Sequence, residues 1–111
     1  MDVNPDGLAE TVNQLEPAGV TISQHVVDVT NRERMMSLPE DVLKTHDSVN
    51  LLFNNAGINF QRSFEEMSLE DWELSLGINL WGVIYGSKAF LPSSILRPFA
   101  SFYAKGLKDQ A

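Results

Sequence analysis

The chain has 111 residues, which is enough for one small domain at most. Its net charge of −7 argues against nucleic acid and anionic membranes as partners, because both require basic patches. The sequence has no cysteine, which excludes disulfides and thiolate metal sites, and no apolar run or leading segment typical of a membrane or secreted protein, so we expect a cytoplasmic location.

The first predicted element is a helix that begins at Asn4-Pro5, because asparagine caps helices and proline suits their first position. Pro17 and Gly19 are expected to end this helix. Residues 20–27, which are rich in valine and isoleucine, are then predicted to form a β-strand.

A second helix is predicted to begin at about residue 31, where Thr30 to Glu33 has the form of a capping box. Pro39 removes one backbone hydrogen bond from this helix, so we expect a kink or two short helices around residues 37–40. The apolar segment 49–53 predicts a second strand.

The last predicted helix covers residues 68–91, with Ser68 as its cap and Pro92 at its end. Three glycines in this helix are expected to permit close packing, at a cost of up to about 1 kcal/mol each relative to alanine: Gly77, Gly82 and Gly86. The alternation of strands and helices predicts parallel strands joined by right-handed crossovers.

The most informative motif is Asn54-Asn55-Ala56-Gly57, which directly follows the predicted strand 49–53. Small residues allow a ligand to approach the backbone at the carboxyl end of a parallel strand, and asparagines supply hydrogen-bond donors and acceptors there. Three more segments agree with it in order and spacing: Asp2-Val3-Asn4, Asp28-Val29-Thr30 and Ile78-Asn79-Leu80-Trp81-Gly82. Together, the four motifs resemble those of the short-chain dehydrogenase/reductase family over roughly residues 1–92.

This resemblance implies an α/β fold, in the form of a partial Rossmann fold, or doubly wound parallel sheet, that lacks the first strand and the later strands. Residues 1–92 are then a partial NAD(P)-binding domain, and residues 93–111 form a tail that does not align. Without a first strand, segments 20–27 and 49–53 would face a gap, so they must pair directly, recruit another chain or stay partly molten.

The resemblance also assigns roles to individual residues. Asn79 corresponds to the family's catalytic asparagine, which acts indirectly by holding a water molecule. The implied cofactor contacts are Asp2 at the adenosine ribose, Asp28 and Val29 at the adenine, and Asn55, Ala56 and Gly57 beside the cofactor's ribose. If Asp2 binds the ribose, NAD is preferred over NADP, since a carboxylate repels a 2′-phosphate.

Other interpretations of these residues stay open. Asp2 could be a frayed surface residue, Asp28 could form a turn before Thr30, and the asparagines could tie neighbouring strands together. The sequence contains neither the family's glycine-rich turn nor its Tyr-x-x-x-Lys motif. Tyr103 and Lys105 do not replace that motif, because positions i and i+2 point to different sides of a helix.

Three functional hypotheses follow, and whether the chain is itself an enzyme stays open. The first is an oxidoreductase fragment, derived from NAD(P)-dependent hydride transfer between alcohol and ketone and inactive alone. The second is a binding or oligomerisation module that pairs with a copy of itself or a full-length relative through helix 68–91. The third is a nucleotide-binding domain with weak adenosine affinity through Asp28.

Two further groups of side chains are candidate sites. The stripe along the last helix is expected to form a core face first and an interface second: Trp72, Leu76, Leu80, Trp81 and Ile84. His25 and His46 lie 21 positions apart without companion ligands. We therefore expect no metal site, and we expect His25 to be half-buried with its hydrogen bonds satisfied.

Overall fold

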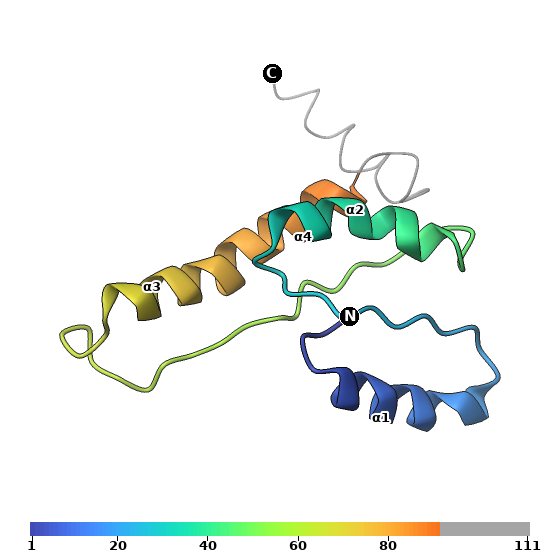
Figure 1. Cartoon of the computed structure of the whole chain (residues 1–111), viewed down its shortest axis with the longest axis horizontal. Helices are drawn as coiled ribbons and strands as arrows, with labels where there is room; N and C mark the ends of the chain where they lie inside the picture. Colours follow the sequence, from blue (N-terminus) through green and yellow to red (C-terminus); the bar gives the residue numbers. More distant parts are fainter. Residues whose placement is uncertain (92–111) are drawn as a thin grey trace, which may run out of the picture.

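The computed structural model describes residues 1–91, so the tail 93–111, with Tyr103 and Lys105, lies outside the described residues. The regular elements within that range are helical (Figure 1): α1 (Pro5–Leu15), the 3-10 turn η1 (Glu16–Ala18), α2 (Arg32–Leu43), α3 (Leu69–Leu76), the π-helical turn η2 (Gly77–Gly82) and α4 (Val83–Phe90). None of these helices is long and apolar enough to cross a membrane.

Side-chain caps fix where the helices begin, largely as the sequence predicts. The Asn4 side chain accepts hydrogen bonds from two backbone amides at the start of α1, and Ser68 forms a reciprocal capping box with Asp71 at the start of α3. The predicted capping box at Thr30 is wrong. The cap of α2 is Asn31, whose side chain accepts from the Arg34 amide.

One of the two predicted alternatives, that Pro39 divides this segment into two short helices, is wrong. The element is one helix from Arg32 to Leu43, with Pro39 buried inside it. The proline ring therefore contributes to packing, and burial of apolar surface offsets the backbone hydrogen bond that proline cannot donate.

Neither predicted strand, 20–27 or 49–53, is a strand within the described residues. Both segments are extended, but the only ladder contact among residues 1–91 is an isolated parallel bridge between Asp2 and Val26. The Val27 amide donates to the Asp2 carbonyl over 2.9 Å, and the Asp2 amide donates to the His25 carbonyl over 3.3 Å. A strand requires a hydrogen-bonded neighbour, and residues 1–91 supply too few partners to build a ladder.

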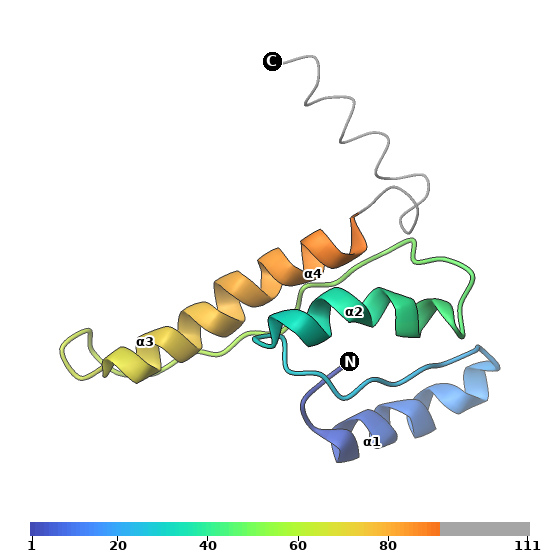
Figure 2. The same cartoon turned by 45° about the horizontal axis from the view of Figure 1, so that its top comes forward.

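The predicted helix 68–91 is one helical path, but its centre is wound differently from its ends. Residues Gly77–Gly82 form a π-helical turn, η2, between α3 and α4. The π turn was not predicted from the sequence. Figure 2 shows α3, η2 and α4 as one long rod, with α2 lying beside its α4 end.

The hydrophobic core lies between α2, α4 and the extended segment that precedes α2. Five residues are buried in it: Val27, Met35, Leu38, Ala89 and Phe90. The expectation of a core face along Trp72 to Ile84 is wrong, since Leu76, Leu80 and Trp81 are each close to half exposed. The face that packs inward is instead made of Gly82, Gly86, Ala89 and Phe90.

The prediction that glycines permit close packing is confirmed for the long helix. A Cβ atom added to Gly82 would lie 2.8 Å from Val29 Cγ2 and 3.0 Å from Val29 Cβ. One added to Gly86 would overlap Asn54 Oδ1. The helix backbone is therefore in close contact with Val29 at Gly82 and with Asn54 at Gly86.

Candidate functional site

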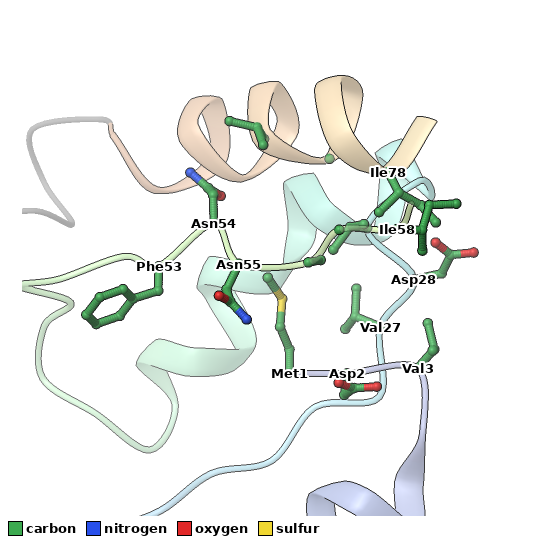
Figure 3. Close-up of a pocket in the computed structure, with 15 residues that line it drawn as sticks. Met1, Asp2, Val3, Val27, Asp28, Phe53, Asn54, Asn55, Ile58 and Ile78 are labelled. Carbon is green, nitrogen blue, oxygen red and sulfur yellow. The ribbon is translucent and has the colours of Figure 1, made fainter. Parts of the chain in front are cut away.

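A pocket of about 460 Å³ lies where three separate parts of the chain meet (Figure 3). Its walls come from residues 1–3, from residues 27–29 and from the segment 53–58, and the helix adds Ile78, Gly82 and Val83. All six residues that the sequence assigned to cofactor contact line this one pocket: Asp2, Asp28, Val29, Asn55, Ala56 and Gly57.

The two carboxylates of the pocket are each held by a local turn. Asp28 Oδ1 accepts hydrogen bonds from the Thr30 amide and from Thr30 Oγ1, both over 2.8 Å. Asp2 Oδ1 accepts from the Asn4 amide over 2.9 Å. Within residues 1–91 the second oxygen of each carboxylate has no hydrogen-bond partner, so it is available to a ligand. The turn interpretation of Asp28 is thus confirmed, and it is compatible with ligand binding.

The segment Asn54 to Gly57 presents alternating faces to its surroundings, as an extended chain does. Figure 3 shows the Asn55 side chain directed toward Met1, across the pocket, while the Asn54 side chain is directed toward the helix. Asn54 Nδ2 donates to Ser87 Oγ over 3.2 Å, so its partner lies on α4 and not on a neighbouring strand. Asn54 therefore anchors the segment while Asn55 faces the pocket.

Asn79, the predicted catalytic residue, does not line the pocket. Its side chain lies in η2 and clamps the backbone of Ile58: the Ile58 amide donates to Asn79 Oδ1 over 2.9 Å, and Asn79 Nδ2 donates to the Ile58 carbonyl over 2.8 Å. In this structure Asn79 thus holds the end of the pocket segment in place. Such a side-chain clamp satisfies both backbone groups, as a neighbouring strand would.

The chemistry of the lining favours a neutral polar ligand group. Two aspartates and two asparagines offer acceptors and donors, and the described residues that line the pocket include no lysine or arginine. Ribose hydroxyls and an adenine amine match such acceptors, whereas phosphate oxygens require cationic groups or clustered backbone amides. The described side chains therefore match the adenosine part of a dinucleotide, and none of those in the lining is a lysine or arginine that would match its pyrophosphate.

The sequence did not reveal the residues that support this pocket from behind. Ser87 carries a hydrogen bond to the pocket residue Asn54, and Gly82 gives the space in which Val29 sits. Only the glycine spacing along the helix gave a signal of such contacts. Ser87 lies 33 positions from Asn54, and local spacing cannot predict a partner at that distance.

Comparison with known proteins places these features in one family. The family model described as short chain dehydrogenase matches residues 1–99. An oxidoreductase of Mycobacterium tuberculosis, SadH, is 34% identical over 94 residues, which cover 85% of this chain and 34% of the relative. A 3-oxoacyl-[acyl-carrier-protein] reductase, FabG, of Thermotoga maritima is 28% identical over 94 residues, which cover 85% of this chain and 38% of the relative.

Solved structures agree with this assignment. A short-chain dehydrogenase/reductase of Burkholderia phymatum, solved in complex with NAD, superposes with a TM-score of 0.77 at 36% identity and covers 82% of this chain and 32% of its own. An alcohol dehydrogenase of Thermococcus sibiricus, complexed with 5-hydroxy-NADP, gives a TM-score of 0.76 at 28% identity, over 81% of this chain and 39% of its own.

The chain thus spans about a third of the length of the relatives and structures that it matches. Its fold class is confirmed as part of a Rossmann fold, in which extended segments take the places of the predicted strands. The pocket at residues 1–3, 27–29 and 53–58, the family model and the superposed structures lead to one conclusion: this chain belongs to the short-chain dehydrogenase/reductase family of oxidoreductases.

Proposed function

We propose that this chain carries the adenosine-binding part of the NAD(P) site of an oxidoreductase that transfers hydride between an alcohol and a ketone. The observation that supports this most is the convergence of all six predicted contact residues on one pocket. The B. phymatum relative was solved with NAD, and it shares 36% of its residues with this chain over the matched part.

We further propose that the 111 residues do not catalyse the reaction alone. Hydride transfer in a carbonyl reductase requires an acid that protonates the substrate oxygen, and a tyrosine with a lowered pKa and a nearby lysine is the family's solution. The sequence has no Tyr-x-x-x-Lys motif and no glycine-rich turn for the pyrophosphate. The chain's role in this proposal is to bind and orient the adenosine end, with Asn79 as a positioning residue for the segment at Ile58.

Asp2 should determine which dinucleotide binds. Its free oxygen can accept from the ribose diol, and its charge repels a 2′-phosphate. We expect Asp2→Asn to weaken NAD binding about tenfold, which corresponds to roughly 1.4 kcal/mol, and to bring the affinities for NAD and NADP closer together. Isothermal titration calorimetry with each dinucleotide at millimolar concentration measures both effects.

Asp6→Asn provides the matched control, because it removes the same charge from a residue that does not line the pocket. We expect its NAD affinity to equal that of the unchanged chain. Equal binding of NAD and NADP by the unchanged chain would contradict the role of Asp2. The absence of heat with NAD, NADP and AMP would contradict the adenosine site as a whole.

A second candidate function is an oligomerisation module, and the exposed apolar side chains of the long helix favour it. Leu74, Leu76, Leu80 and Trp81 are between 47% and 49% exposed, and side chains of this kind on one helix are typical of a subunit interface. We therefore propose that helix 68–91 pairs with a second copy of this chain or with a full-length relative.

We expect the chain to sediment as a dimer at high micromolar concentration and the double variant Leu80→Glu/Trp81→Glu to sediment as a monomer, since a charge cannot be buried unpaired at an interface. Analytical ultracentrifugation measures this shift. Leu51→Glu is the control, because Leu51 is 69% exposed but is not part of the long helix. Monomeric behaviour of the unchanged chain, without co-elution with a full-length relative, would rule the module out.

A further inference from the structure

Two histidines that are 21 positions apart in the sequence meet at one serine hydroxyl, away from the pocket lining. Ser23 Oγ lies 2.8 Å from His46 Nε2 and 3.1 Å from His25 Nε2. Ser23 and His25 are two positions apart on an extended segment, so their side chains share a face. His46 follows α2, and its amide donates to the Val42 carbonyl over 3.0 Å.

The chemistry of the hydroxyl limits where the protons of this cluster can lie. A hydroxyl has one proton and two lone pairs, so Ser23 can donate to at most one imidazole, and at least one imidazole must donate its own N–H to the serine oxygen. With both rings neutral, or with one proton added to the donating ring, both hydrogen bonds persist. A proton on each ring leaves two cations on either side of one hydroxyl, and their repulsion opposes the contact.

The charged groups around His25 also oppose its protonation. The Met1 amino group, Arg34 and His46 each disfavour a positive charge on it, and Asp41 alone favours one. Asp41 already pairs with Arg34 over 2.6 Å and with Lys44 over 2.7 Å. Burial, the largest cause, together with these cations lowers the pKa of His25 below its usual value of 6.5.

A metal ion is a poorer occupant for this cluster than a proton. The two imidazoles offer only two nitrogen ligands, and in the part of the chain that the structure describes no three His, Cys, Asp or Glu side chains are placed so that they could hold a metal ion together. The neighbouring Arg34 would also repel a divalent cation.

We propose that Ser23, His25 and His46 form a pH-sensitive latch, which holds the extended segment before α2 against the turn after α2 while at most one imidazole is charged. The latch is coupled to the pocket. The His25 carbonyl accepts from the Asp2 amide, and Val27 donates to Asp2, so release of His25 loosens the edge on which Asp2 lies.

The sign of the effect follows from the lowered pKa of His25. The unfolded or released chain binds the proton more readily than the latched chain does, so acid favours release. The contribution of His25 to stability is complete above the ordinary pKa of about 6.5 and is lost as the pH falls through the lower folded value.

Nuclear magnetic resonance tests the latch directly, because the chain has only two histidines and their ring signals are easily followed. We expect His25 to titrate below its ordinary value, and the amide signals of Asp2 and Val27 to shift with the same midpoint. In Ser23→Ala, which removes the hydroxyl that joins the two rings, we expect the Asp2 and Val27 amides to lose their response to the titration of His25. Ser48→Ala, at an exposed serine outside the cluster, should leave all four signals unchanged.

Two results would overturn the proposal. One is a chain in which His25 titrates at its ordinary pKa of about 6.5. The other is a chain in which His25 titrates at a lower pH while the Asp2 and Val27 amides do not respond. The first result would show that the cluster does not form, and the second would show that it is not coupled to the pocket.

Discussion

Replacement of Phe90 by alanine is expected to destabilise the chain by about 3–5 kcal/mol, because it leaves a cavity where a large side chain was buried. Phe90 is 4% exposed and is one of the five buried hydrophobic residues that form the core of the described part of the chain. The stability of a small domain is about 5–15 kcal/mol, so this loss is a large part of the total. Urea denaturation followed by circular dichroism should show a lower midpoint or no cooperative transition.

Phe53→Ala is the matched control, because it removes the same side chain from a position that is 75% exposed. We expect its urea midpoint to stay within experimental error of the unchanged chain. If Phe53→Ala is as destabilising as Phe90→Ala, then the apolar centre of the molecule does not lie between α2 and α4. It would lie on the opposite face of the extended segments, where Leu51 and Phe53 are exposed.

Replacement of Gly82 by alanine is expected to cost about 1–3 kcal/mol, the range for inserting a methyl group into a packed contact. The new Cβ would lie 3.0 Å from Val29 Cβ, an atom that cannot rotate away because it is bonded to the backbone. This cost outweighs the gain of up to about 1 kcal/mol that alanine brings to an exposed helix position. The backbone amide signals of Val29 should move more than those of any residue in α1.

Gly7→Ala tests the same exchange without the clash. Gly7 lies in α1, and a Cβ there would first meet the end of the Asn4 side chain, at 3.4 Å. We expect this variant to keep or slightly raise the free energy of unfolding. A Gly82→Ala variant that is as stable as Gly7→Ala would mean that the long helix does not touch the segment at Val29.

The helix starts could be predicted from the sequence because the signals for them are local. Asn4 and Ser68 each satisfy amides within three positions of themselves, so spacing alone identifies them. Strands differ, because their hydrogen bonds come from another part of the chain. Segments 20–27 and 49–53 have the composition of strands but lack hydrogen-bonded neighbours within residues 1–91. Composition therefore predicted that these segments are extended, but it could not predict whether they pair with another strand.

The pocket could be predicted almost as well as the helix starts, because its residues sit in short motifs at the ends of extended segments. The motifs predict cofactor contacts at Asp2, Asp28 and Asn55, and in the structure all three residues line one pocket. The role of Asn79 could not be predicted in the same way. Its clamp on Ile58 depends on how η2 is wound, and nothing in the local sequence indicates a π turn.

Two asparagine contacts hold the ends of segment 54–58 at two points of the long helix. Asn54 is held at Ser87 and Ile58 at Asn79, so the segment runs antiparallel to the helix. Four extended residues span about 13 Å, and eight helical residues rise by about 12 Å. The two spans are similar, so both anchors form at once in this register. We expect an insertion of one residue between the anchor points to lengthen the segment by about 3 Å and to release one of them. The length of segment 54–58 is thus matched to the helix beside it.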